Sequence, residues 1–336
     1  MSCTSENFLD GCLLQTEDDE RLLSEMESRS ISLPTIYKVG EMPVIRWDDT
    51  WEDFIDRRGD NIEIMMEEKS RCVFPWVVFD SLPETKTLVK GLYYSQGDRP
   101  SCMGHADDFA YRSGVLSSIA LGAPLVYSET NPYLLWRLSK NRSERGGQSV
   151  AKMAKAANEI GHFSVAQAGK DNTNVSNDFI ANEDEPRKMA LKHQSAVVWL
   201  QSKTAAGIAD QIMRYARAGF GVALGNGTAV KGSTIDKNNV QIAVLGGSWS
   251  HATSFTTWMK RKGSEYVFWA NSHGKLYKKA TFKEPFDGCW MTREILERFL
   301  AASFDYGMPY CVVPETVFTE VRNLMFDFQI PFPPNF

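Results

Sequence analysis

A cysteine stands at the start of a predicted helix in the stretch SQGDRPSCMG, residues 95–104. Ser101 is a suitable N-cap, and from Met103 onward apolar residues recur at helical spacing. Cys102 then lies in the first turn, where unpaired N–H groups and the positive end of the helix macrodipole favour a thiolate. Free cysteine is also a common buried filler. Cys102 is therefore a candidate nucleophile whose base must come from the rest of the chain.

A thiolate nucleophile needs a base within hydrogen-bond reach and a third group that orients the base. His251 begins a β-rich run after the stretch GGSWS, and Asn271 ends the next run, so antiparallel pairing can bring the two together. His105 is expected to point along its own helix surface. His162 and His193 lie in polar, loop-like sequence and are expected to be solvated. Because a histidine in a strand is by default structural, these residues alone leave a structural role open.

Two kinds of structure must position these residues. Up to Gly219 the sequence predicts helices near 102–120, 149–160 and 204–219. Beyond Gly219 the runs GVALGN, VQIAVLGG, HATSFTTWMK and YVFWANS are β-rich, and a hairpin centred on Gly263-Ser264 is expected between the last two. A later helix is expected in MTREILERFLAASF. Helices followed by antiparallel strands predict an α+β protein.

Composition narrows the function classes. The 336 residues carry a net charge of -5 with dispersed basic residues, which argues against nucleic acid or an anionic membrane as the main partner. No apolar run approaches the ~20 residues that a bilayer span needs, and the N-terminus lacks the blocks of a signal peptide. Six scattered cysteines without a CxxC pair indicate neither a disulfide framework nor a zinc site. We expect a protein without cofactors in a reducing, cytoplasmic compartment.

Several motifs together resemble the papain-like cysteine peptidases. They are Gln96-Gly97-x-x-x-Ser101-Cys102, then His251-Ala252, then Asn271-Ser272-x-Gly274. Between them, RGGQSVAKMAKAANEIG resembles that family's Gly-Gly loop followed by an alanine-containing helix. The similarity runs from about Val73 to about Tyr277, with the motifs in the family's order.

The resemblance implies a papain-like fold, with a helical half carrying the Cys102 helix and an antiparallel β half carrying His251 and Asn271. It also implies a hydrolase that cleaves peptide bonds in a peptide or protein substrate. Cys102 attacks the carbonyl carbon as a thiolate paired with protonated His251, and Asn271 holds the imidazole. The Gln96 side-chain amide and the Cys102 backbone N–H form the oxyanion hole.

The Gly-Gly pair at Gly146 and Gly147 matches the edge on which family members pair the backbone of a peptide substrate. Without Cβ atoms, such an edge lets another chain approach closely. A plain loop before a helix explains the two glycines equally well, so both interpretations stay open.

The chain departs from the family pattern at several positions. Met103 replaces the usual aromatic residue after the nucleophile, and His273 replaces the Trp that shields the His–Asn hydrogen bond. Secreted members join the two neighbouring loops by a disulfide, and here Arg99 and Glu144 stand at those places. We expect an ion pair between them.

Residues 1–73 form an N-terminal extension to the papain-like domain of residues 74–336. A capping box at Thr16–Asp19 predicts an acidic helix, and a second short helix is expected from Thr50. Their apolar faces are too narrow for a separate core and must be buried on something. The extension either folds over the Cys102 cleft as an inhibitor or docks outward on a protein partner. Docking is favoured, because the extension shows no likeness to the family's inhibitory segments.

Three functions compete. The leading interpretation is a cysteine peptidase (a thiol protease). The second is a papain-fold structural or binding component of a large intracellular assembly, such as a virion, with weak or no activity. The third is an amidase or acyl transferase that uses the same Cys-His-Asn chemistry with an amine as acceptor.

Overall fold

The structure is a computed structural model that describes residues 12, 16–19, 21, 51–68, 95–121, 127, 129–140, 146–164, 195–273 and 287–314. Glu144, His193 and Gly274, which carry expectations from the sequence, lie outside these ranges.

A six-stranded sheet forms the centre of the described fold. Its order is β1-β6-β2-β3-β4-β5, and neighbouring strands are antiparallel, with one additional parallel contact between β3 and β5. The strands are β1 (Ser195–Trp199), β2 (Gly221–Ile235), β3 (Gln241–Arg261), β4 (Ser264–Asn271), β5 (Asp287–Thr292) and β6 (Tyr310–Pro314). The expected β-rich runs are thus confirmed, although two of them join into the single long strand β3.

The hairpin between β3 and β4 turns one residue earlier than expected. Lys262 and Gly263 are its two central residues, and both have positive φ angles, of 48° and 78°. This is the conformation that a two-residue hairpin needs in order to match the twist of its strands. The turn fixes which β4 residues lie opposite His251.

The helices are α2 (Trp51–Glu68), α4 (Cys102–Ala120), α5 (Pro132–Ser139), α6 (Val150–Glu159), α10 (Ala205–Arg217) and α11 (Arg293–Leu300), followed by the short 3-10 helix η4 (Phe304–Tyr306). Side chains satisfy several of their first N–H groups, as Ser149 does for α6 and Thr204 for α10. The helices expected near 102–120, 149–160 and 204–219 are confirmed.

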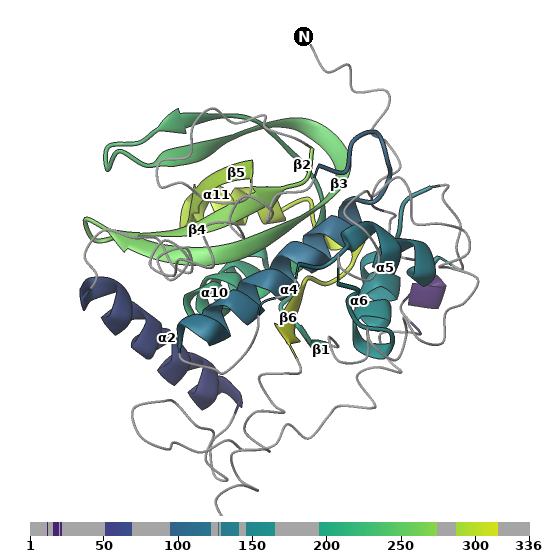
Figure 1. The fold of residues 1–336 in the computed structure, drawn as a ribbon. Helices are drawn as coiled ribbons and strands as arrows, with labels where there is room; N and C mark the ends of the chain where they lie inside the picture. Colours follow the sequence, from purple (N-terminus) through teal and green to yellow (C-terminus); the bar gives the residue numbers. More distant parts are fainter. Residues whose placement is uncertain are drawn as a thin grey trace, which may run out of the picture.

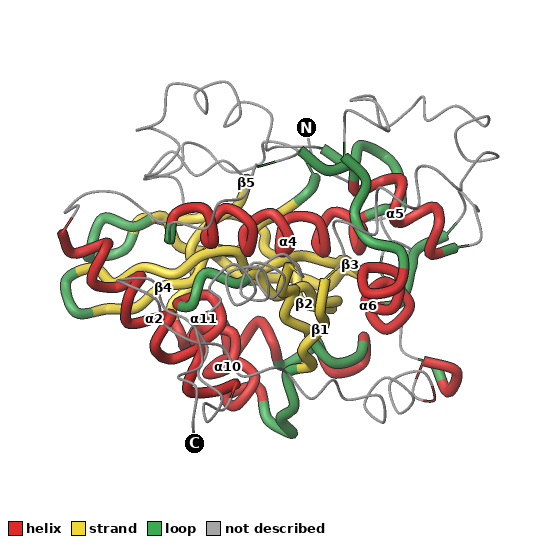
Figure 2. Tube along the Cα trace, turned by 60° about the horizontal axis from the view of Figure 1, so that its bottom comes forward, coloured by secondary structure: helices red, strands yellow, loops and turns green. Residues whose placement is uncertain are grey.

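Helix α4 lies between a helical half and the sheet. In Figure 1 it runs diagonally between β3–β4 and the pair α5 and α6. Figure 2 shows α4 on one side of the strands and α2, α10 and α11 on the other. One buried cluster packs the sheet against α10 and α11, and a second packs α4 and α6 against β2 and β6. This is the α+β, papain-like arrangement expected from the sequence.

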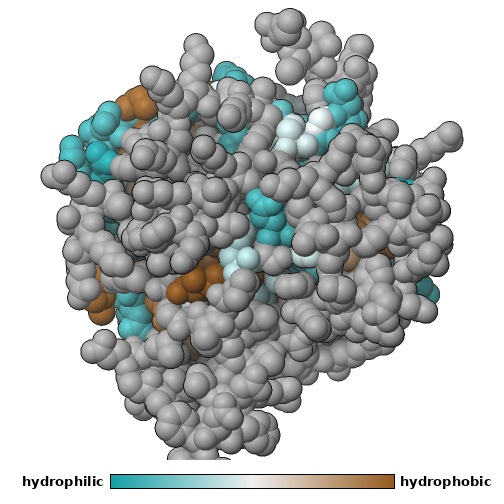
Figure 3. Space-filling view, in the orientation of Figure 1, coloured by the Kyte–Doolittle hydropathy of each residue, from teal (hydrophilic) through white to brown (hydrophobic). Residues whose placement is uncertain are grey.

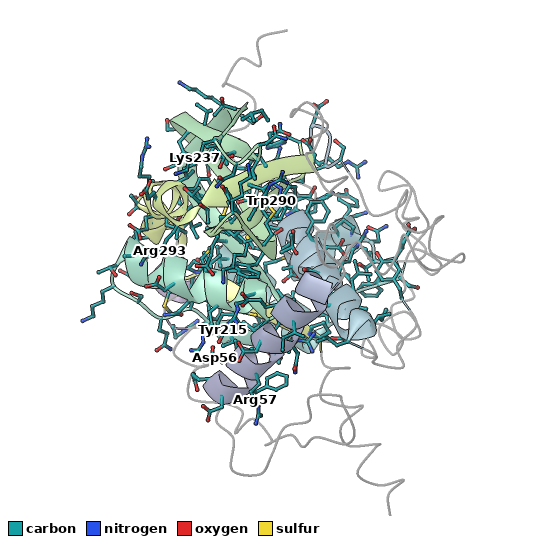
Figure 4. The ribbon with its side chains drawn as sticks, turned by 90° about the vertical axis from the view of Figure 1, so that its left-hand side faces the viewer. Asp56, Arg57, Tyr215, Lys237, Trp290 and Arg293 are labelled. Carbon is teal, nitrogen blue, oxygen red and sulfur yellow. The ribbon has the colours of Figure 1, made fainter. Side chains whose placement is uncertain are left out.

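Helix α2 packs on the same chain and continues to Glu68, so it is longer than expected. Phe54 and Ile55 are buried in the core around α10. Arg214 of α10 pairs with Asp56 at 2.6 Å, and Figure 4 shows Asp56 next to Tyr215 of α10. The expectation that this apolar face turns outward is therefore wrong. A protein partner for other parts of residues 1–73 stays a prediction.

None of the helices in the described ranges is long and apolar enough to cross a bilayer. On the face drawn in Figure 3, the described residues form small, separate hydrophilic and hydrophobic patches.

Candidate active site

Cys102 is the first residue of α4, as expected, and its side chain is fully buried. Its Sγ accepts the backbone N–H of Ala252, which follows His251 on β3, at 3.3 Å. Ser101 is the N-cap residue, as expected, but its side chain makes no capping hydrogen bond. The contact to Ala252 fixes the start of α4 against the strand that carries the candidate base.

His251 and Asn271 come together through the register of β3 and β4. Ser254 pairs with Ala270. Continued by one residue, this register places Asn271 diagonally across from His251, and both side chains lie on the same face of the sheet. Nε2 of His251 lies 3.0 Å from Oδ1 of Asn271. The Asn271 oxygen therefore accepts the Nε2 hydrogen and fixes the tautomer of the imidazole.

Gln96 ties the loop before α4 to the end of β4. Its backbone N–H donates to the carbonyl of Ser272 at 2.8 Å, and the Ser272 hydroxyl donates to its side-chain oxygen. The Gln96 side-chain nitrogen donates to the carbonyl of Arg99 at 2.7 Å, three residues before Cys102. Backbone and side-chain contacts thus join the four sequence-predicted residues Gln96, Cys102, His251 and Asn271 in one site.

The missing family Trp does not leave the His–Asn hydrogen bond exposed to water. His251 is 2% exposed and Asn271 is 0% exposed. Trp249, two residues before His251, packs edge-on against its ring with centroids 4.7 Å apart. Trp249 thus covers the dyad from β3, the strand that also carries His251. Sequence reasoning missed this role, although the i, i+2 spacing on a strand is a usable signal.

Burial controls the charge of the candidate nucleophile and base. It raises the pKa of the Cys102 thiol to about 12, against the opposing effect of the N–H groups that contact the sulfur. Burial, and then the neighbouring His273, lower the pKa of His251 well below its usual value. Both pKa shifts favour the neutral thiol and the neutral imidazole over the expected thiolate–imidazolium pair, because desolvation outweighs the N–H groups around the sulfur.

Two further histidines are buried. His105 points back along its own helix, as expected, with its Nδ1 3.0 Å from the Ser101 carbonyl one turn earlier, but it is only 1% exposed. His162 is not solvated: it is buried, 2.8 Å from a carboxylate oxygen of Asp107, and stacked on Tyr111. Both act as polar members of the core around α4.

The burial of His105 predicts a pH-dependent stability. Burial lowers the pKa of His105 to about 4 from an ordinary 6.5. The unfolded chain therefore takes up a proton between these two values, while the folded chain does not. As the pH falls from about 6.5 to about 4, the free energy of unfolding of the wild-type chain, measured relative to His105→Gln, should fall by about 1.4 kcal/mol per pH unit. Urea unfolding at several pH values measures the difference, and parallel curves would contradict it.

The glycine edge before α6 is occupied by the chain's own N-terminal segment. Gln148, directly after Gly147, forms a parallel β-bridge with Cys12. Cys12 is 1% exposed, and its carbonyl accepts the hydroxyl of Ser250, which precedes His251. Gly146 has a φ of +68°, which favours glycine for the turn into this edge. Cys12 therefore contacts both the glycine edge, at Gln148, and β3, the strand that carries His251.

The Cys12 side chain fills the space beside Gly225 of β2. A Cβ added at Gly225 would come within 2.6 Å of Cys12 Sγ and 2.7 Å of the Tyr306 Cβ. Gly225 pairs with Ala252, whose N–H contacts Cys102, so the two thiols lie in one region of the site. The sequence contained no signal for Cys12, because it sits far from every family motif.

Asp19 anchors the same segment at the start of α6. It is 1% exposed and accepts the Ser149 hydroxyl at 2.8 Å. Thr16 and Asp19 form the expected capping box, with the Asp19 N–H donating to the Thr16 hydroxyl and the Thr16 N–H donating to the Asp19 carboxylate. We call residues 12 and 16–19 the N-terminal strap.

Arg99 and Met103 are two further positions at which the sequence departs from the family pattern. The guanidinium of Arg99 lies over the Tyr133 ring at 4.2 Å, and its expected partner Glu144 lies outside the described residues. Met103 is fully buried in the α4 core.

Within the described ranges, no group of three or more possible ligands gathers to hold a metal ion, and Cys12, Cys102, Cys289 and Cys311 are free thiols.

Solved structures found to be similar to this chain are cysteine proteases. Xylellain from Xylella fastidiosa is 13% identical over 66% of this chain and 81% of its own, with a TM-score of 0.41. The Amb a 11 cysteine protease, a ragweed pollen allergen in its proform, is 13% identical over 96% and 83%, with a TM-score of 0.45. The digestive procathepsin L2 proteinase of Tenebrio molitor larval midgut is 13% identical over 89% of each chain, with a TM-score of 0.43. No protein-family model and no curated protein matches the chain.

Proposed function

We propose that the chain is a cysteine peptidase that hydrolyses peptide bonds with Cys102 as nucleophile and His251 as base. The observation that carries this proposal is the convergence of Cys102, His251 and Asn271 from α4, β3 and β4, with Nε2 of His251 held 3.0 Å from the Asn271 oxygen. A nucleophile, a base and a group that orients the base are what acyl transfer through a thiol requires.

In this proposal each residue has a defined step. Cys102 gives its proton to Nδ1 of His251 and attacks the carbonyl carbon of the substrate. The Cys102 backbone N–H and the second N–H of the Gln96 amide stabilise the oxyanion. His251 then protonates the leaving amine and later takes a proton from the water that hydrolyses the thioester. We also propose an intracellular, reducing location, because the four described cysteines are free thiols.

We further propose that the N-terminal strap keeps the peptidase latent. The strap pairs with Gln148, directly after the Gly146-Gly147 edge that the resemblance assigns to substrate, and its Cys12 carbonyl accepts the Ser250 hydroxyl next to His251. Burial under this segment is consistent with a neutral thiol and a neutral imidazole. A substrate backbone and Cys12 cannot occupy the edge at the same time, so the strap must leave before a peptide binds.

Asn271 gives a graded test of the proposed roles. Asn271→Ala removes the acceptor that orients His251 but no reacting group, so turnover of a fluorogenic peptide should fall about 10- to 100-fold, less than after loss of Cys102. Thr253→Val is the matched control, because Thr253 is a buried polar residue on β3, two residues from His251. The control should keep the wild-type rate. Equal losses in both variants would contradict the orienting role of Asn271.

A specific observation also favours a second candidate, a papain-fold binding or structural protein. Cys102 is 0% exposed, and its sulfur contacts the Ala252 N–H rather than the candidate base in the described structure. Peptidase activity that stays at background after removal of the strap, in a folded protein, would support this candidate. No described feature favours an amine over water as the acyl acceptor.

A further inference from the structure

His273 occupies a place at the site that the proposed mechanism does not yet explain. His273 follows the end of β4, and its ring lies over the ring of His251 on β3. The two rings overlap with centroids 3.9 Å apart and planes inclined by 23°. Nε2 of His273 lies 3.0 Å from Nδ1 of His251. His273 therefore covers the ring nitrogen that Asn271 leaves unused.

Nδ1 is the atom of His251 that must exchange a proton with Cys102. Because the Asn271 oxygen accepts the Nε2 hydrogen, Nδ1 of the neutral ring is an acceptor. The Nε2 hydrogen of His273 then meets this lone pair, while Cys102 Sγ accepts the N–H of Ala252. The thiol and its base are each engaged by a group other than their reaction partner.

We propose that His273 is a positioning residue that gates the base: it caps Nδ1 of His251 in the resting enzyme and moves away when a substrate enters. This inference rests on the function proposed above. Once His273 has moved, the S–H bond of Cys102 breaks, its proton bonds to Nδ1, and the electron pair stays on sulfur. The step yields one thiolate and one imidazolium.

The position of His273 in the chain suits a movable cap. Strand β4 ends at Asn271, and Ser272 and His273 follow in a bend, so a shift of His273 need not break the strand pairing. Ser272 stays tied to Gln96 by two hydrogen bonds. The gate can therefore open while the residues that hold the site together remain in place.

Burial and a neighbouring imidazole favour the closed, neutral state of the stack. Among the described titratable groups, His105 of α4 lies near both rings. Burial lowers the pKa of His273 to about 4, and the nearness of His273 and His105 lowers that of His251 further. With His273 in place, a protonated His251 would have imidazoles as its titratable neighbours and no described carboxylate to stabilise its charge. Removal of the cap should therefore favour the thiolate–imidazolium pair.

Alkylation of Cys102 in the full chain tests the gate without requiring peptidase activity. The rate constant for iodoacetamide is measured from about pH 5 to 10 by peptide mass mapping. His273→Phe keeps an aromatic ring but removes the N–H, and it should raise the rate near pH 7 at least about tenfold, which corresponds to one unit in apparent thiol pKa. His273→Gln restores a side-chain N–H donor and should keep the slow wild-type rate.

The double variant shows whether His273 acts through the base. In a His251→Phe background, His273→Phe should change nothing, because there is no Nδ1 to uncap. An unchanged pH profile in His273→Phe would overturn the gate, and so would a slower rate, which would make His273 the base itself. Failure of Cys102 to react in folded His273→Phe, although it reacts after unfolding in urea, would also overturn it. A chain without peptidase activity that still shows the predicted profiles would refute the proposed function and not the gate.

Discussion

Replacing Cys102 by serine is expected to reduce peptide hydrolysis by the strap-free chain to the background rate. A serine hydroxyl has nearly the shape of the thiol, but it is a far weaker nucleophile at neutral pH, because the thiolate is the reactive species. Activity against a fluorogenic peptide measures the effect. Thermal unfolding should show only a small change, since the substitution leaves no large cavity at this buried site.

Cys289→Ser is the matched control for this prediction. Cys289 is another buried thiol, on β5, and it packs in the core on the other side of the sheet. Its substitution should leave peptide hydrolysis unchanged. If Cys102→Ser unfolds the protein while His251→Ala retains full activity, Cys102 is a core residue and not the nucleophile.

Deletion of residues 1–21 is expected to raise peptidase activity and Cys102 reactivity at least about tenfold. The deletion removes the Cys12 bridge to Gln148 and the Asp19 contact to Ser149, and it returns water to the site. Rehydration favours the thiolate, so the apparent pKa of Cys102 should fall from about 12. Rates of peptide cleavage and of Cys102 alkylation measure the change.

Point variants give a finer control for the strap. Asp19→Ala should show part of the activation, because it removes the buried anchor at Ser149, whereas exposed Asp18→Ala should show none. Deletion of all of residues 1–73 is a poor test, because it also removes the buried residues Phe54 and Ile55 of α2. If the 1–21 deletion leaves activity unchanged but alters the oligomeric state, measured as the number of chains per particle in solution, the strap is a docking element and not an inhibitor.

The sequence predicted those parts of the fold whose signals are local. The helix from Cys102 and the β-rich runs followed from periodicity, and the Thr16–Asp19 capping box followed from spacing. The placement of Asn271 beside His251 needed only antiparallel pairing across one hairpin. Even there the turn differed by one residue, because positive φ at Lys262 and Gly263 determined it.

The features that were missed depend on packing between segments far apart in the chain. His162 was expected in solvent, yet Asp107 and Tyr111 enclose it from α4. The neutral state of Cys102 also follows from burial, which a helix-start argument does not contain. Cys12 reaches the site across more than a hundred residues of sequence, and only the assembled sheet shows the space beside Gly225 that it fills.

The central claim is that Cys102 is a nucleophile activated by His251 and held latent by the strap. The most direct measurement is labelling with an epoxide thiol inhibitor selective for papain-like sites, mapped by mass spectrometry in the full chain, the 1–21 deletion and the deletion carrying His251→Ala. We predict slow labelling of the full chain, rapid labelling of Cys102 alone in the deletion, and loss of that labelling without His251. Labelling that is equally slow in all three folded proteins, or that falls on several cysteines alike, would contradict the claim.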